Sequence, residues 1–162
     1  MVVRRRRRLV SRPRIVVRRS PIHGRGVFAN VDLPAQARRL EYRGERIDSA
    51  EAFRRHGDNS GLGETYLFAV NEDWLIDGCA GGNSARYINH SCDPNCEAVI
   101  WVDIDGDARR DRVYIETLRP IRKGEELSFD YALGLSHAID AAERERWRCR
   151  CAAACRGSLL KD

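Results

Sequence analysis

Long apolar runs are absent from this sequence, and lysine is scarce. No stretch approaches the roughly 20 consecutive apolar residues that a membrane-spanning helix needs. The basic N-terminus is not followed by the apolar segment, about 7–15 residues long, of a secretory signal. We therefore expect an intracellular protein without a membrane partner, cytoplasmic in a bacterial host and nuclear or chromatin-bound in a eukaryotic one. The chain has 27 arginines and only two lysines, Lys123 and Lys161.

The 162 residues that are present are 43% hydrophobic and 33% charged, which suits one globular domain with short appendages. Many short strand-like segments separated by glycine-marked turns predict a mainly β fold with little helix. Asp48 and Glu51 have the spacing of a capping box and predict a short helix that ends near Gly57. A second short helix is expected over 138–146. Strands are expected over 14–18, 27–29, 40–47 with an interruption at Gly44, 65–70, 74–77, 99–102 and 113–115, and before Tyr131.

Positive charge is concentrated at the N-terminus. Residues 1–19 contain nine arginines and no acid, while the whole chain has a formal net charge of +5, so the remaining residues carry −4. Residues 1–14 form an arginine-rich arm, for which two interpretations stay open. The arm is either a solvated, disordered tail, or it contacts nucleic acid or serves nuclear import in a eukaryotic host. The mildly acidic body could attract a cationic peptide.

The six cysteines are grouped rather than scattered. Three lie at Cys149, Cys151 and Cys155, two at Cys92 and Cys96, and Cys79 stands alone. A chain without a secretion signal is not expected to form disulfides, so this clustering favours a metal site.

Residues 86–96 form the most informative segment, because they place an arginine, an asparagine, a histidine and two cysteines around a proline turn. With the segment 126–131 (Glu-Leu-Ser-Phe-Asp-Tyr) and the cysteine tail 149–155, the pattern resembles the SET-domain lysine methyltransferases from about Ile15 to Leu159. The resemblance implies a fold of small curved sheets with a knot-like crossing that brings Asn89 and His90 beside Tyr131. It also implies a SET domain over 15–135 and, over 136–162, a linker helix and a zinc-bearing post-SET tail.

The same resemblance implies a reaction, the transfer of methyl groups from S-adenosylmethionine to a lysine side-chain amine of a histone or another basic protein. Tyr131 matches the catalytic tyrosine, which orients the amine, and positioning supplies most of the rate gain in such a transfer. The implied cofactor-binding residues are Gly24, Arg25, Gly26, Tyr66, Arg86, Asn89 and His90. The implied substrate channel contains Tyr42, Phe129 and Trp147. A phenylalanine at 129 leaves room for di- or trimethylation.

By the same resemblance, Cys92 and the three tail cysteines bind one structural zinc ion, whereas Cys79 and Cys96 are structural thiols. This chain departs from the family pattern in the tail. Three residues separate Cys151 from Cys155 where the family usually has four, and Ala152 replaces a usual glycine.

Two other interpretations belong to different functional classes. The chain could be a catalytically inactive SET-like module that binds zinc and contacts nucleic acid or protein through its arm. The presence of Tyr131, Asn89 and His90 argues against this module, because an inactive protein does not need them. A zinc-binding DNA reader would need a helix-based finger spacing, which the sequence lacks. The sequence carries no signal for an oligomeric state.

Overall fold

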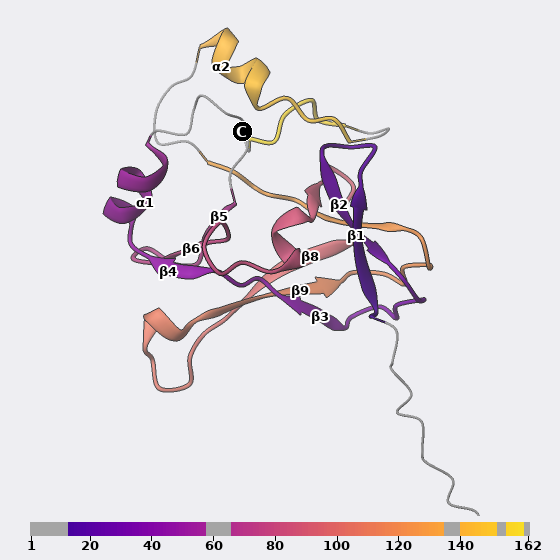
Figure 1. Ribbon diagram of the computed structural model, residues 1–162, viewed down its shortest axis with the longest axis horizontal. Coiled ribbons are helices and arrows are strands. Elements are labelled where there is room, and N and C mark those ends of the chain that lie inside the picture. The colour runs from indigo at the N-terminus through magenta and orange to yellow at the C-terminus, as the bar shows by residue number, and fades with distance from the viewer. Residues whose placement is uncertain (1–12, 58–65, 135–139, 152–154, 161–162) are drawn as a thin grey trace, which may run out of the picture.

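The computed structural model describes residues 13–57, 66–134, 140–151 and 155–160 (Figure 1). Of the arginine-rich arm predicted over 1–14, all but Pro13 and Arg14 lies outside these ranges. The described part contains ten strands in three sheets and two short α-helices, so the prediction of a mainly β fold is confirmed. Within this part, no helix is long and apolar enough to cross a membrane.

The first sheet brings together segments that are far apart in the sequence. Strands β1 (Ile15–Arg19) and β2 (Arg25–Ala29) form an antiparallel hairpin, and β10 (Glu126–Phe129) pairs with the other edge of β2. The two-residue strand β7 (Asn89–His90) then pairs with β10 in parallel, with His90 opposite Phe129. This parallel pair carries the residues around 90 and 130 to the same end of the sheet.

The other two sheets have three strands each. One has the order β3 (Arg38–Glu41), β9 (Arg112–Thr117) and β8 (Cys96–Trp101). The other has the order β4 (Glu45–Ile47), β6 (Leu75–Asp77) and β5 (Leu67–Ala69). The segment 40–47 therefore forms two strands of different sheets, joined at Gly44. A Cβ at Gly44 would lie 2.2 Å from the carbonyl oxygen of Asp77, so this junction requires glycine.

Helix α1 (Ser49–His56) begins and ends where its capping residues predict. The Asp48 carboxylate accepts a 2.7 Å hydrogen bond from the Glu51 amide, and Gly57 follows the last helical residue with a positive φ of 62°. Helix α2 (Ala141–Arg146) covers the described part of the predicted segment 138–146. Two 3₁₀ turns, η1 (Ser84–Tyr87) and η2 (Ala108–Arg110), complete the described helical structure.

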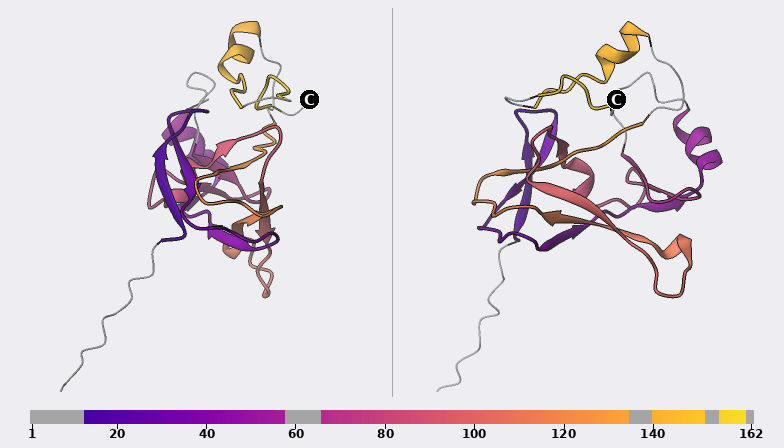
Figure 2. Two further views of the ribbon diagram at one scale, coloured as in Figure 1. Left: turned by 90° about the vertical axis from the view of Figure 1, so that its right-hand side faces the viewer. Right: turned by 180° about the vertical axis from the view of Figure 1, so that it is seen from behind.

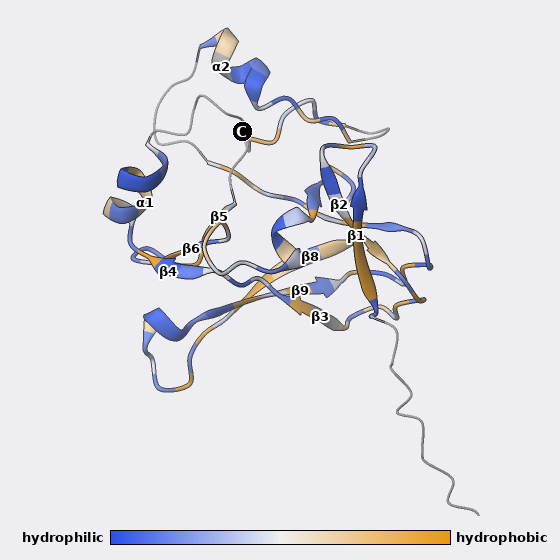
Figure 3. Cartoon of the chain, in the orientation of Figure 1, coloured by the Kyte–Doolittle hydropathy of each residue, from blue (hydrophilic) through white to orange (hydrophobic). Residues whose placement is uncertain are grey.

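The core lies where the sheets meet, and the tail lies outside it. Val27 in β2, Val113 in β9 and Leu127 in β10 are fully buried, whereas α1 is mainly polar (Figure 3). The tail after α2 lies at the same end of the molecule as the turn between β1 and β2 (Figures 1 and 2), and both border one pocket. It is attached to the body by few backbone contacts, among them the bridge between Leu133 and Leu160. This arrangement places the tail over the end of the first sheet.

Candidate active site

Tyr131 lies two residues beyond the end of β10 and is fixed by its backbone as well as by its side chain. Its amide donates a 3.1 Å hydrogen bond to Nδ1 of His90, and its hydroxyl donates a 2.7 Å hydrogen bond to the carbonyl oxygen of Ile88. Because Nδ1 of His90 accepts from an amide, a neutral imidazole carries its proton on Nε2. That nitrogen lies 3.3 Å from Sγ of Cys92. The imidazole is thus engaged on both sides and is not placed to act as a general base.

Asn89 connects β7 to the turn between β1 and β2. Its amide nitrogen lies within hydrogen-bond distance of the carbonyl oxygens of His23 and Arg25, at 3.2 and 3.0 Å, and of Oε1 of Glu126, at 2.8 Å. Gly26 leaves the space for this network, since a Cβ there would lie 2.1 Å from the same Glu126 oxygen. The Asn89 side chain therefore holds the turn in place.

A first pocket of about 180 Å³ opens between this turn, η1 and the tail. Six of the seven residues that the sequence assigned to the cofactor lie in its lining, and Gly26 does not. Tyr131 also borders it, as does Trp147, which the sequence had placed in the substrate channel. The lining consists of Ile22, His23, Gly24, Arg25, Tyr66, Arg86, Tyr87, Asn89, His90, Tyr131, Leu133, Arg146, Trp147, Arg148, Cys149, Arg150 and Leu159.

A second pocket of about 270 Å³ also borders Tyr131 and has an aromatic wall. The ring centroids of Phe129 and Tyr131 are 5.0 Å apart, those of Phe68 and Phe129 are 6.2 Å apart, and Tyr42 lies 5.2 Å from Phe68. The full lining consists of Tyr42, Leu67, Phe68, Ala69, Arg86, Ile88, Phe129, Tyr131, Ala132, Leu133 and Gly134. Arg86, Tyr131 and Leu133 border both pockets, so the two pockets are neighbours that share these side chains.

The two tyrosine hydroxyls of this region are neutral hydrogen-bonding groups. Burial, the largest cause, raises the pKa of Tyr131 and the pKa of Tyr42 well above their usual value. The Tyr42 hydroxyl donates a 2.8 Å hydrogen bond to the carbonyl oxygen of Tyr66. Both hydroxyls therefore keep their protons at neutral pH, where they can donate or accept hydrogen bonds without acting as phenolate bases.

Arg86 forms the wall between the two pockets. Its Nη1 donates a 2.8 Å hydrogen bond to the carbonyl oxygen of Gly78, and its guanidinium lies 4.7 Å from the ring centroid of Tyr87. Nε of Arg86 and Nε1 of Trp147 are buried and have no hydrogen-bond partner among the described residues. The wall of the first pocket thus retains hydrogen-bond donors that its own residues do not satisfy.

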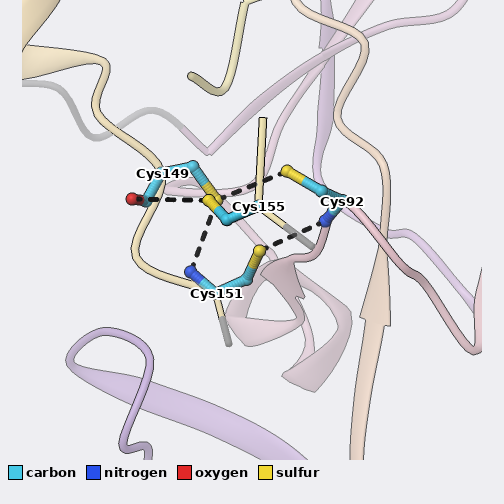
Figure 4. A group of neighbouring side chains, drawn as sticks. All are labelled: Cys92, Cys149, Cys151 and Cys155. Carbon is cyan, nitrogen blue, oxygen red and sulfur yellow. Dashed lines mark hydrogen bonds between the residues drawn. The ribbon is translucent and has the colours of Figure 1, made fainter. Parts of the chain in front are cut away.

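Four thiols gather where the tail meets the body (Figure 4). The sulfur atoms of Cys92, Cys149, Cys151 and Cys155 all lie within 4.8 Å of one another, and those of Cys92 and Cys149 are 3.7 Å apart. Tetrahedral zinc with Zn–S bonds of about 2.3 Å requires sulfur atoms about 3.8 Å apart. The cluster fits such an ion, and three residues between the last two cysteines suffice to bring Cys155 to it.

Hydrogen bonds prepare one of these thiols to act as a ligand. Burial by itself raises the pKa of Cys92, but hydrogen bonds with His90 and with the backbone amide of Arg156 outweigh it and lower the pKa to about 6. Burial raises the pKa of Cys149, which a bound cation would reverse. The other two cysteines do not belong to the cluster, since Cys96 is buried in the core and Cys79 is exposed.

Comparison with known proteins agrees with this geometry. The model of the SET domain family matches residues 24–132, so the chain belongs to the SET domain family. It is 39% identical over 144 residues to a histone-lysine N-methyltransferase, H3 lysine-4 specific, of Emericella nidulans, a match that covers 87% of this chain and 11% of that protein. The protein of the same name from Saccharomyces cerevisiae is 38% identical over 148 residues, covering 90% of this chain and 13% of the relative.

The histone-lysine N-methyltransferase trithorax of Drosophila virilis is 42% identical over 115 residues, covering 70% of this chain and 3% of that protein. The chain therefore spans a small fraction of the length of these curated relatives.

Some pocket residues could not be found from the sequence. Tyr87 lies between two stacked guanidinium groups, those of Arg25 and Arg86, each 4.7 Å from its ring centroid. Leu133 and Leu159 reach the first pocket because the bridge between Leu133 and Leu160 brings the tail back to the end of β10. Tyr87 lies inside the informative segment 86–96 but was not assigned to a pocket, and no motif marks Leu133 or Leu159, so only the folded chain reveals their place.

Proposed function

We propose that the protein transfers methyl groups from S-adenosylmethionine to the side-chain amine of a lysine in a histone or another basic protein. The observation that supports this proposal best is that two neighbouring pockets share Tyr131 in their linings. Two reactants that enter from opposite sides would face each other beside one hydroxyl group. The names of the relatives point to the same reaction, with histone H3 as the substrate to test first. A histone substrate would place the protein in the nucleus of a eukaryotic host.

The first pocket suits the methyl donor. Its lining offers aromatic faces at Tyr66, Tyr87 and Trp147 for a purine ring, and guanidinium groups such as Arg25 for a carboxylate. The unsatisfied N–H groups of Arg86 and Trp147 belong to the same wall. When bound, S-adenosylmethionine would supply an electrophilic methyl group attached to a sulfonium.

The second pocket suits the side chain of lysine, whose amine must be neutral to act as a nucleophile. A water-poor aromatic channel lowers the pKa of an ammonium group and so favours the neutral amine. Aromatic faces such as those of Tyr42 and Phe129 also attract the cation as it enters. The Tyr131 hydroxyl, held at the junction by Ile88, would orient the amine through a hydrogen bond.

Phe129 is expected to set the number of methyl groups. Its ring is buried and borders the second pocket beside Tyr131. A phenylalanine contributes no hydroxyl that could hydrogen-bond to the amine or to a water molecule there. We propose that the resulting space admits a mono- or dimethylated amine for a further transfer, which gives di- or trimethyllysine.

The four cysteines would hold a structural zinc ion. Four thiolates fill a tetrahedral site and leave no position for a substrate, so the ion would stabilise the tail rather than react. Because Cys149 borders the first pocket, a stapled tail would also close that pocket.

A methyl-transfer assay with a matched variant tests the proposal. Purified protein is incubated with isotope-labelled S-adenosylmethionine and a histone H3 tail peptide, and the products are located by mass spectrometry. We expect label on a lysine with the wild type and almost none with Tyr131→Phe, although both proteins bind the cofactor. A histone mixture, and the peptide with its lysines replaced by arginine, serve as controls. Absence of cofactor binding to the wild-type protein would contradict the proposal and favour an inactive module.

A further inference from the structure

Three exposed arginines alternate with two buried residues where helix α2 passes into the tail. Arg146, Arg148 and Arg150 are exposed, whereas the residues between them, Trp147 and Cys149, are only 5% and 6% exposed. This alternation follows from burying the two apolar side chains against the body. The segment is held by the hydrogen bond from the Leu159 amide to the Trp147 carbonyl oxygen, 2.9 Å, and by the bridge between Arg148 and Ser158.

The same three arginines line the mouth of the first pocket, where positive charge exceeds what the proposed methyl donor needs. Among the described residues, the lining contains five arginines, the three in the row together with Arg25 and Arg86, and no aspartate or glutamate. S-adenosylmethionine has one carboxylate and two cationic groups, so a single guanidinium would balance its carboxylate. The surplus is notable because residues 20–162 together have a formal net charge of −4, from +5 for the chain and +9 for residues 1–19.

Ion pairs between the row and the acidic side chains that the structure describes are sparse. In the described part of the chain, no ion pair involves Arg146 or Arg150, and Arg148 pairs only with the exposed Glu145, 3.0 Å away. An exposed ion pair of this kind contributes little to stability, so another anion can readily take the place of the glutamate. Other exposed arginines differ, since Arg43 pairs with Glu41 at 2.8 Å and Arg110 with Asp107 at 3.2 Å.

We propose that the row formed by Arg146, Arg148 and Arg150 binds the phosphate backbone of nucleic acid across the mouth of the first pocket. Arg148 forms an antiparallel bridge with Ser158, and two residues of β-strand geometry, the spacing from Arg148 to Arg150, span about 6.6 Å. Phosphates advance about 3.4 Å per nucleotide along one strand, so the row can meet alternate phosphates. Guanidinium groups also pair with phosphate in a two-pronged geometry that suits this partner. This surface is separate from the arginine-rich arm.

The surface has a consequence for the pocket beneath it. A strand bound across the row covers the opening through which a small molecule must enter, so nucleic acid and S-adenosylmethionine compete. This consequence rests on the proposed function, whereas the binding of nucleic acid does not. The two can therefore be tested and can fail separately.

Binding is measured with the full chain and a fluorescent single-stranded DNA of about 20 nucleotides, longer than typical single-strand sites of about 4–16 nucleotides. Anisotropy is recorded over a range of salt concentrations for the wild type and for Arg146→Gln/Arg148→Gln/Arg150→Gln. The loss of three phosphate contacts lowers the slope of log affinity against log salt concentration by about 2. We therefore expect this variant to bind the DNA about a hundredfold more weakly than the wild type at about 0.1 M salt. The control Arg43→Gln/Arg54→Gln/Arg110→Gln removes the same charge from exposed arginines that pair with acids.

The control triple should retain nearly all of the affinity. Both triples are repeated with Arg4 to Arg8 replaced by glutamine, which removes the contribution of the arm. Equal losses from the two triples would overturn the proposal, because they would show that only net charge matters. Binding of polyglutamate with the same affinity and the same dependence on the row would also overturn it in favour of an acidic protein partner. Retention of zinc and an unchanged unfolding temperature show that the variants are folded.

Competition is read separately by equilibrium dialysis of S-adenosylmethionine. We expect added DNA to weaken the binding of S-adenosylmethionine to the wild type. In the Arg146→Gln/Arg148→Gln/Arg150→Gln variant, we expect cofactor affinity to be the same with and without DNA. If the wild type bound S-adenosylmethionine equally well with and without DNA, the proposed competition would be wrong. A chain that binds DNA through the row but binds no cofactor would refute the proposed function alone.

Discussion

Tyr131 and Cys149 both border the first pocket, but different interactions hold them there. Tyr131 lies two residues beyond β10, a strand of the first sheet that contains the fully buried Leu127. It makes two hydrogen bonds to the segment 88–90. Cys149 belongs to a tail that touches the body through a few backbone contacts, the thiol cluster and the ion pair of Arg156 with Asp130 at 2.8 Å. The floor of the pocket is therefore part of the hydrophobic core, whereas its cover lies outside that core and is held by the buried Trp147 and by four thiols that could bind a metal ion.

His90 connects these two regions. One ring nitrogen accepts from the Tyr131 amide, and the other lies 3.3 Å from Sγ of Cys92. The floor and the cover of the first pocket can therefore be distinguished by experiment. Changes in the floor should alter catalysis or global stability, and changes in the cover should alter metal content and access to the pocket.

The largest effect is expected from Tyr131→Phe, which removes one hydroxyl from the floor and leaves the ring in place. We expect methyl transfer to fall about 10²- to 10³-fold, as for other single donors at a reacting centre. Cofactor affinity and the unfolding temperature should stay close to the wild-type values. Full activity in this variant would remove Tyr131 from its proposed role.

Cys151→Ser changes the cover and leaves the floor intact. We expect loss of the bound zinc and a fall in methyl transfer of about 10- to 100-fold, since the tail is no longer stapled over the pocket. Metal analysis and protease sensitivity of the tail are the measurements, and Cys79→Ser, outside the cluster, is the control. If the core unfolded together with the tail, the proposed division between floor and cover would be wrong.

Asn89→Ala tests the link between the floor and the turn at Gly24. The substitution leaves the carbonyl oxygens of His23 and Arg25 without this donor, so we expect a loss of about 1–3 kcal/mol in the free energy of unfolding. Chemical denaturation measures it. Asn30→Ala removes one exposed hydrogen bond, to the Pro13 carbonyl oxygen, and should cost less. Equal losses would mean that Asn89 has no special role in the floor.

The pH dependence should reflect the raised pKa values of Tyr42 and Tyr131. An unfolded tyrosine loses its proton near pH 10, while the folded protein still holds it, so stability falls as the pH rises above about 10. Below that pH, methyl transfer should increase with pH as the substrate amine becomes neutral, without a decline from tyrosine ionisation. Denaturation curves between about pH 8 and 11, with Tyr42→Phe for comparison, measure the first effect, and initial rates measure the second.

Phe129→Tyr is expected to have the smallest effect on total activity, and a clear effect on the products. An added hydroxyl in the second pocket takes the space and the hydrogen-bonding position needed for a further methyl group. Mass spectrometry should show a shift from di- and trimethyllysine to monomethyllysine, with the first transfer changed by only a few fold. An unchanged product distribution would show that other residues set the volume.

Local chemistry was readable in the sequence because it depends on neighbouring residues. The capping residues Asp48 and Gly57 gave the ends of α1, and the grouping of the cysteines indicated a metal site before any contact was known. The motifs around 90 and 130 identified the residues that the fold brings together. These features are encoded by side-chain type and spacing, which the sequence states directly.

Tertiary structure decided the features that depend on long-range pairing. The strand at Asn89 is two residues long and has no periodicity of its own, so its parallel pairing with β10 exists only in the folded chain. The same holds for the split of the segment 40–47 between two sheets, and for Trp147, which the tail brings to the first pocket instead of the second. The outward row of arginines also follows from the burial of its neighbours against the body. Composition and local propensity do not specify which distant surfaces meet, because those contacts are selected by packing of the whole domain.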